Sequence, residues 1–110
     1  MSKLRTTTKY KDGDSLPPIH PGEVLKSEFM EPLNLSATQL ALHMGIPLSR
    51  IIMIVNGKRN LTADTAFRLA KVFKTTPDFW LNLQSQYEVE MLDYTGATEK
   101  ICLEVREIKR

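Results

Sequence analysis

The stretch SATQLALHMGIPLSRIIMIVNGKR, residues 36–59, decides the fold, because it holds two short helical patterns joined by a tight turn. Ser36 is followed three residues later by Gln39, a pair in which each side chain satisfies a free backbone amide at a helix start. Gly45 ends this first helix, since a left-handed backbone conformation costs least at glycine. A second apolar pattern follows within a few residues and ends at Asn56-Gly57. So short a connection between two amphipathic helices predicts helix-turn-helix geometry.

Three further helices are predicted around this pair. Apolar residues at helical spacing predict a helix over about residues 21–31. Thr62 can cap a helix with one apolar face that ends near residue 74. A cap, a first-turn proline and an acid in Thr76-Pro77-Asp78 together predict a last helix over about residues 77–94. The chain is therefore expected to be all-α, with five helices in one helix-turn-helix domain over residues 19–95.

The two ends of the chain lie outside this pattern. Residues 1–18 are rich in Thr, Lys, Asp and Gly and end in two prolines, so we expect a flexible N-terminal arm that buries little apolar surface. Residues 96–110 form a C-terminal extension whose apolar residues alternate as in a strand but fit a helix nearly as well. The apolar residues that give these two patterns are Ile101, Leu103, Val105 and Ile108. The sequence therefore leaves both a strand and a helix open for residues 96–110.

The composition is that of one globular domain. Apolar residues make up 42% of the 110 residues and charged residues 25%. The single cysteine, Cys102, excludes an internal disulfide and a zinc site of the usual two-cysteine, two-histidine kind. The first ten residues lack the apolar stretch of an export signal, and the longest apolar run, residues 51–55, is far shorter than a membrane span. We therefore expect a cytoplasmic protein that does not enter a membrane.

Charge is distributed unevenly along the chain. Residues 46–74 carry six basic side chains and one acidic side chain, a net charge of +5. Residues 75–110 carry four basic and seven acidic side chains, a net charge of −3, and residues 1–45 are balanced. Such an asymmetry indicates that the middle of the chain meets a polyanion and that the last third meets a different partner.

The second helix of the pair carries the side chains expected to recognise DNA. Ser49, Arg50 and Met53 lie on the side opposite its apolar core residues, so they would project toward base edges and phosphates. Ser49 can form hydrogen bonds, and Arg50 can bind phosphate or guanine. Met53 or Leu48 can contact a thymine methyl group. The alternative is an ordinary solvated helix face, but exposed Ile52 and Met53 on a basic face favour a surface that becomes covered.

Asn56-Gly57-Lys58-Arg59 follows this helix directly and is predicted to contact the DNA backbone. The glycine would let backbone amides approach phosphates, and the two cations add positive charge. The alternative is a helix end followed by solvated cations. Gln39, if it is not fully used as a cap, could also reach a phosphate.

The last predicted helix carries a stripe of aromatic residues. Trp80, Tyr87 and Tyr94 recur at intervals of seven, with Leu83 and Met91 between them. Part of this stripe is expected to pack on the core of the domain. The stripe is also predicted to form the interface of a symmetric homodimer, in which two recognition helices could read a palindrome.

No catalytic or metal site is expected. His20 and His43 are too few and too far apart in sequence to indicate a ligand set. The acids Glu88, Glu90 and Asp93 are typical of a solvated helix face, with no nucleophile, oxyanion donor or metal cluster nearby in sequence. The chain is therefore not expected to be an enzyme or to need a cofactor.

Four segments together resemble the HigA family of antitoxins, also called virulence-associated protein I-like, within the Xre and Cro repressor superfamily. They are HPGEVL at residues 20–25, Leu40-Ala41 to Gly45, Asn56-Gly57-Lys58, and TPDFWLNLQ at residues 76–84. The Asn-Gly-Lys element is shared by the wider superfamily, whereas the first and last segments are narrower signals. The resemblance covers about residues 19–94 and leaves both ends of the chain outside it.

The resemblance implies a five-helix, lambda-repressor-like domain that dimerises and binds double-stranded operator DNA in its own promoter. Carried over by position, phosphate contacts fall on Ser36, Asn56, Lys58 and Arg59, and base contacts fall on Leu48, Ser49, Arg50 and Met53. The forward face of this helix is more apolar than the glutamine-rich reading helices of some phage repressors. No operator sequence is therefore predicted.

The resemblance also implies a protein partner, a toxin that this chain neutralises. Toxins of this kind, the HigB-like proteins, are ribosome-dependent mRNA nucleases. The acidic last third of the chain offers charge complementarity to a basic toxin. The alternative is a stand-alone Xre-type transcriptional regulator without a toxin partner.

Overall fold

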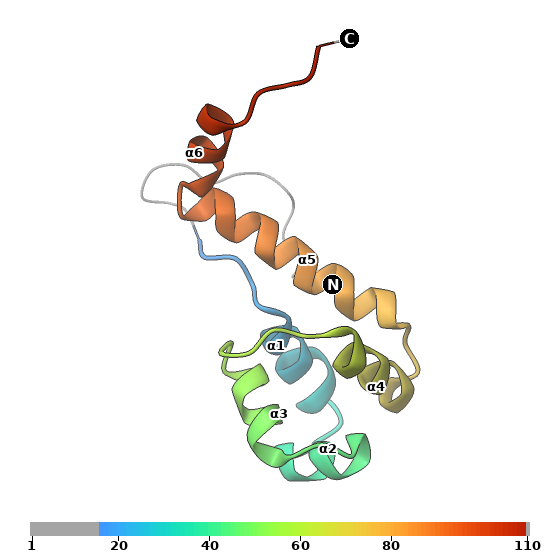
Figure 1. Cartoon of the computed structure of the whole chain (residues 1–110). Coiled ribbons are helices and arrows are strands. Elements are labelled where there is room, and N and C mark those ends of the chain that lie inside the picture. Colours follow the sequence, from blue (N-terminus) through green and yellow to red (C-terminus); the bar gives the residue numbers. More distant parts are fainter. Residues whose placement is uncertain (1–15, 110) are drawn as a thin grey trace.

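The computed structural model describes residues 16–109, which form helices joined by short loops (Figure 1). The helical elements are α1 (Pro21–Val24), η2 (Leu25–Met30), α2 (Ala37–Met44), α3 (Leu48–Val55), α4 (Ala63–Phe73), α5 (Pro77–Tyr94) and α6 (Ala97–Glu104). No strand occurs in this range. No single helix among the described residues is long and apolar enough to cross a membrane, and α2 and α3 meet that test of length and composition only together, across a bend of 119°.

The predicted all-α helix-turn-helix fold is confirmed, with one helix more than the five expected. The count is six when the continuous α1 and η2 are taken as one helix. The additional helix is α6, which lies in the C-terminal extension. Most of the arm expected at residues 1–18 lies outside the described residues.

α1 and η2 together are the helix expected over residues 21–31. The side chain of His20 caps α1, with its Nδ1 atom accepting a hydrogen bond of 2.9 Å from the backbone N–H of Gly22. After Val24 the helix widens to the π form. α1 also approaches the end of α3 closely, because a Cβ atom at Gly22 would lie 1.8 Å from the carbonyl oxygen of Ile54. Only glycine allows this contact between α1 and α3.

α2 and α3 form the predicted helix-turn-helix. The expected cap is complete: Oγ of Ser36 accepts from the N–H of Gln39 at 3.1 Å, and Oε1 of Gln39 accepts from the N–H of Ser36 at 2.9 Å. Gly45 ends α2 in the left-handed conformation, with a φ of 70°. The guanidinium of Arg68 on α4 donates to the carbonyl of Met44 at 2.9 Å. This bond satisfies a free carbonyl at the end of α2 and holds the turn against α4.

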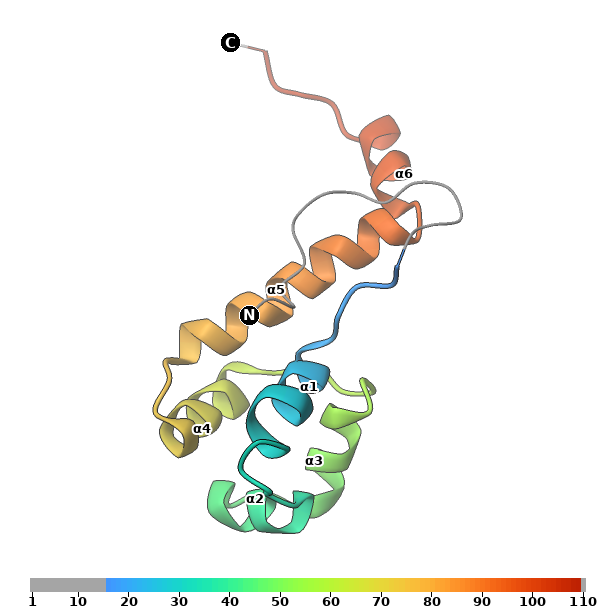
Figure 2. The same ribbon diagram turned by 180° about the vertical axis from the view of Figure 1, so that it is seen from behind.

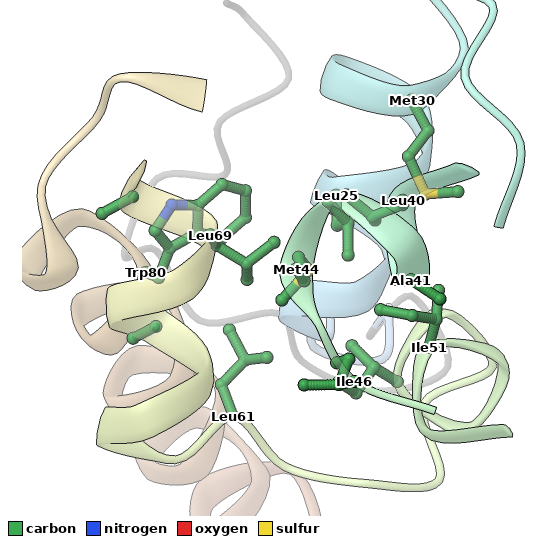
Figure 3. Close-up of a cluster of buried hydrophobic side chains, with 13 residues drawn as sticks. Leu25, Met30, Leu40, Ala41, Met44, Ile46, Ile51, Leu61, Leu69 and Trp80 are labelled. Carbon is green, nitrogen blue, oxygen red and sulfur yellow. The ribbon is translucent and has the colours of Figure 1, made fainter. Parts of the chain in front are cut away.

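The core lies between the group formed by α1, η2, α2 and α3 and the pair formed by α4 and α5 (Figure 3). Trp80 on α5 is 0% exposed, and three phenylalanine rings, those of Phe29, Phe73 and Phe79, surround it at centroid distances between 4.8 and 6.3 Å. Its Nε1 donates to Oγ1 of Thr75 at 2.8 Å. The other large and fully buried side chains come from η2, α2, α3 and α4: Leu25, Leu40, Ile51, Ile54 and Leu69.

A buried glutamine links α5 to the loop that precedes α4. Oε1 of Gln84 accepts from the backbone N–H of Leu61 at 2.8 Å, and Nε2 of Gln84 donates to Glu88 at 2.8 Å. Both ends of the buried amide therefore have partners. The hydrogen bond to Leu61 fixes the path of the chain after α3, because it connects two segments that are 23 residues apart.

The second half of α5 and the whole of α6 project beyond the bundle (Figure 2). α6 contains no buried residue, and the stretch that follows it, residues 105–109, is exposed and belongs to neither a helix nor a strand. Of the two structures left open for the extension, the helix is therefore the one formed, as far as Glu104. The alternation of apolar residues did not produce a strand, since no neighbouring strand is present among the described residues to pair with it.

Candidate nucleic-acid interface

α3 buries one face and exposes the other. Ile51 and Ile54 are 0% and 1% exposed, so they anchor the helix in the core. On the remaining surface Ser49 is exposed, Met53 is 41% exposed and Arg50 is half-buried. Leu48, the fourth side chain that the sequence assigned to base contacts, is also exposed, so all four reach the surface of one helix, with Arg50 partly covered.

The exposed part of α3 is unusually apolar. Leu48, Ile52 and Met53 all have large exposed fractions, although each is a side chain that proteins normally bury. These three residues lie on a helix of only eight residues, so they form a compact apolar surface. Ile52, which was weighed in the sequence only as a sign of a covered surface, is part of it. An apolar surface of this kind on a basic segment is typical of a binding site.

The side chains of Ser36 and Gln39 at the N-terminus of α2 are largely used within the helix cap, so only their donor groups remain for a phosphate. Ser36 and Gln39 are both exposed, but their mutual hydrogen bonds occupy the hydroxyl oxygen of Ser36 and the carbonyl oxygen of Gln39. Capping is therefore the main task of this pair. What remains for a second partner is the hydroxyl proton of Ser36 and the amide group of Gln39.

The residues Asn56–Arg59, hereafter the basic loop, end α3 and carry two exposed cations. Gly57 has a φ of 74°, and its N–H donates to the carbonyl of Ile54 at 3.0 Å. The N–H of Lys58 donates to the carbonyl of Met53 at 2.8 Å. Of the backbone amides expected to approach phosphate, those of Gly57 and Lys58 are used to close the end of α3. Phosphate contacts of the basic loop have to come from its side chains.

The side chains of the basic loop are available for such contacts. Lys58 and Arg59 are exposed, and neither forms an ion pair with another residue in the range 16–109. Arg68, in contrast, is held by Asp64 across 2.7 Å on the same helix. The hydrogen bond and charge of Arg68 keep the pKa of Asp64 below its usual value, with a smaller contribution from the charge of Arg50. Lys58 and Arg59 are thus exposed cations whose charge is not used by an ion pair within residues 16–109.

The aromatic stripe of α5 runs from the core into solvent. Trp80 is fully buried, so its place in a dimer interface is corrected: the same spacing serves the core at this end of the helix. Leu83 and Tyr87 are half-buried, and the Tyr87 ring contacts the His20 ring at 4.9 Å. Met91 is half-buried and Tyr94 is 49% exposed. The surface open to another chain therefore lies in the C-terminal half of α5.

Sequence reasoning gave His20 no specific role. The side chain is only 7% exposed and is a helix cap, which the pair His20-Pro21 could have indicated, since proline favours the first position of a helix. Burial lowers the pKa of His20, and Glu23, Asn60 and the backbone of Arg59 oppose this effect. Among the described residues, no group of three or more His, Cys, Asp or Glu side chains could hold a metal ion.

The sequence of this chain is similar to those of known helix-turn-helix proteins. The helix-turn-helix family matches residues 27–80. Virulence-associated protein I of Dichelobacter nodosus is 42% identical over 80 residues, which are 73% of this chain and 74% of that protein.

Two solved structures are similar in both sequence and fold. An addiction module antidote protein of the HigA family from Coxiella burnetii is 49% identical, with a TM-score of 0.78, over 84% of this chain and 100% of that one. The Pseudomonas aeruginosa antitoxin HigA, solved with the higBA promoter, is 35% identical, with a TM-score of 0.77, over 84% of this chain and 99% of that one. This chain therefore belongs to the HigA and virulence-associated protein I family of Xre-type helix-turn-helix proteins.

Proposed function

We propose that this chain is a sequence-specific DNA-binding antitoxin that represses its own operon and neutralises a HigB-like, mRNA-cleaving toxin. The observation that carries the DNA-binding part is the surface of α3, where Leu48, Ser49 and Met53 are exposed beside the free cations of the basic loop. The similar antitoxin from Pseudomonas aeruginosa was solved with promoter DNA, which supports the same use of this helix here.

The dimensions of α3 suit the major groove. An α-helix with its side chains is about 10–12 Å in diameter, and the groove is about 12 Å wide, so the exposed face of α3 can enter it. Lys58 and Arg59 follow at the end of the helix, where the phosphate backbone borders the groove. In this arrangement the cations supply affinity for any sequence and the helix supplies discrimination among sequences.

The apolar face of α3 suggests how discrimination would arise. Leu48, Ile52 and Met53 present no hydrogen-bonding group, whereas the methyl group of thymine is the one apolar group in the major groove. Ser49 adds a donor and an acceptor, and the half-buried Arg50 adds a bidentate donor for guanine or phosphate. We therefore infer an operator whose half-sites contain thymine opposite the apolar side chains.

A homodimer would bring two such helices to one operator. The C-terminal half of α5 exposes Val89, Leu92 and Tyr94, and α6 beside it exposes Ile101. Together with Leu83, Tyr87 and Met91, which are half-buried, these side chains can form an apolar contact between two copies. Trp80 takes no part in it, because no surface of this side chain is left.

The experiment that tests DNA recognition is a gel shift on the region upstream of the coding sequence at several salt concentrations. Lys58→Ala is expected to weaken binding to all sequences and to lower the slope of log K against log salt by about 0.9 for each protomer bound, the value for one phosphate. Met53→Ala is expected to alter preference among sequences and to leave this slope unchanged. Lys100→Ala removes the same charge from α6 and is the matched control, with no effect on the slope.

Two results would contradict the assigned roles. If the wild-type chain does not shift its upstream DNA more strongly than unrelated DNA, sequence-specific binding fails. If Lys58→Ala and Met53→Ala cause equal losses that are the same for every sequence, the division between phosphate and base contacts fails.

The toxin partner is tested with the product of the adjacent reading frame. A small basic neighbour that co-purifies with this chain, and whose mRNA cleavage stops when the chain is added, supports the antitoxin part of the proposal. If no neighbour binds or cleaves mRNA while operator binding persists, the chain is a stand-alone regulator. Purified chain alone is expected to leave translated mRNA intact.

A further inference from the structure

His20 is buried at a junction of three segments that are distant in sequence. It caps α1 through Nδ1, and its ring lies edge-on to Tyr87 of α5 at a centroid distance of 4.9 Å. The third segment is the basic loop, since a Cβ atom built on Gly57 would lie 3.8 Å from Cγ of His20. The loop that carries Lys58 and Arg59 therefore passes beside the imidazole, at a distance where one added methyl group would just reach van der Waals contact.

The hydrogen bonds of His20 define how its ring is used. Nδ1 accepts from the N–H of Gly22, so in the neutral ring the proton is on Nε2. Nε2 is buried and has no hydrogen-bond partner within residues 16–109. The side chain of Asn60 and the backbone of Arg59 lie close enough to the imidazole to raise the pKa of His20 against the effect of burial. The imidazole therefore lies next to residues 59 and 60, the stretch at the end of the basic loop.

The basic loop is held to α3 by its first amides, and its remaining supports come from other segments. Its own amides at Gly57 and Lys58 close the end of α3, and the residues from Asn56 to Asn60 are all exposed. Its known anchors on the domain side are the hydrogen bond from Leu61 to Gln84 and the ring of His20. The first of these lies beyond the loop, whereas the imidazole lies beside the loop itself.

We propose that His20 is a positioning residue for DNA binding, which holds the basic loop so that Lys58 and Arg59 meet the phosphate backbone beside α3. The ring fills the space between Gly57 and Tyr87, and it fixes the loop to both α1 and α5. This inference rests on the proposed function, because it assigns His20 to the phosphate contacts of the basic loop. His20 itself does not touch DNA, since it is buried.

The variant that separates this role from capping is His20→Asn. Asparagine is among the best helix caps, so its side-chain oxygen can still accept from Gly22, but it lacks the ring atoms that lie beside Gly57 and Tyr87. Urea unfolding followed by the fluorescence of Trp80, the only tryptophan, checks that the variant folds. Asn60→Ala is a second variant at an exposed position, and it removes the side chain that acts on the His20 ring.

The measured quantities are operator affinity and its salt dependence, by gel shift, in a double-mutant cycle with Lys58→Ala. We expect His20→Asn to weaken binding about 5- to 10-fold and to lower the salt slope by about 0.9 for each protomer bound, as if each had lost one phosphate contact. In the Lys58→Ala background the effect of His20→Asn is expected to fall below about 2-fold, because both changes act on the same contact. Asn60→Ala is expected to weaken binding and to lower the salt slope, as His20→Asn does.

Four outcomes decide between the explanations. Unchanged affinity and slope in His20→Asn, with a normal response to Lys58→Ala, overturns the positioning role while the proposed function stands. A loss of affinity with an unchanged slope and full additivity also overturns it, since the role is then only structural. If the wild-type chain shows no salt-dependent operator binding, the proposed function itself has failed. Should His20→Asn not fold, an unchanged slope in Asn60→Ala overturns the inference.

Discussion

Replacing Gly22 by alanine tests the close contact between α1 and α3. The new Cβ atom would lie 1.8 Å from the carbonyl oxygen of Ile54, and real Cβ atoms essentially never come closer than 3.0 Å to such an atom. The two helices must therefore move apart by about 1.2 Å, the difference between these distances. The obstacle is backbone, so no side-chain rotation can relieve it.

The expected loss of stability follows from this displacement. Leu25 and Ile54, each 1% exposed, are packed next to the contact, and a gap of 0.5–1 Å forfeits about a quarter to a half of the dispersion energy of the atoms that line it. The lost dispersion energy and the usual cost of overpacking together should lower the free energy of unfolding by about 2–4 kcal/mol. Helix propensity acts in the opposite direction, because alanine is favoured over glycine by about 1 kcal/mol. The net loss in the free energy of unfolding should be about 2 kcal/mol. Helix propensity alone would predict a gain, so the sign of the measured change shows which effect is larger.

The assay is urea unfolding at 25 °C and fixed protein concentration, followed by the fluorescence of Trp80. In thermal unfolding, the same loss of about 2 kcal/mol corresponds to a fall of roughly 8–16 °C in Tm for a chain of this size. Gly96→Ala is the matched control: a Cβ there meets nothing within 4 Å, and only the φ of 84° opposes it, at a cost of about 1 kcal/mol. If Gly22→Ala is as stable as the wild type or more stable, the contact between α1 and α3 does not limit the fold and the reasoning is refuted.

Two further predictions concern buried polar groups. Gln84→Leu leaves the buried N–H of Leu61 without its acceptor, so the free energy of unfolding in urea is expected to fall by about 1–3 kcal/mol. Gln86→Leu is an exposed change on the same helix and should lower it far less. Equal losses in the two variants would contradict a role for the hydrogen bond. Because burial lowers the pKa of His20 from 6.5, the unfolded chain binds more protons below that pH, so the free energy of unfolding should fall as the pH falls through about 6.5 and below. The fall should be smaller in His20→Asn, and identical pH profiles would exclude His20 as its source.

Local signals in the sequence predicted most of the helix boundaries. Ser36, Thr62 and Thr76 each accept a hydrogen bond from the backbone N–H three residues later, as their positions before apolar patterns indicate. Gly45 ends α2 as predicted, with a positive φ. These features could be found because a cap or a glycine turn depends on residues only a few positions apart.

Contacts between distant segments could not be predicted in the same way. Trp80 was assigned to a dimer stripe because a spacing of seven identifies one face of a helix without saying what covers that face. The amides of Gly57 and Lys58 were assigned to phosphate, but the carbonyls of α3 use them first. The junction at His20 brings together residues 20, 57 and 87, and no local pattern connects these positions.

α6 has a consequence for the lifetime of the chain in a cell. An isolated helix of eight residues is marginal in water, and α6 gains no stabilisation from burial, because none of its residues is buried. Its backbone amides should therefore exchange with deuterium much faster than those near Trp80. Proteases, which bind substrates in an unfolded form, should cut first at this end, and a partner that covers α6 would slow degradation of the whole chain.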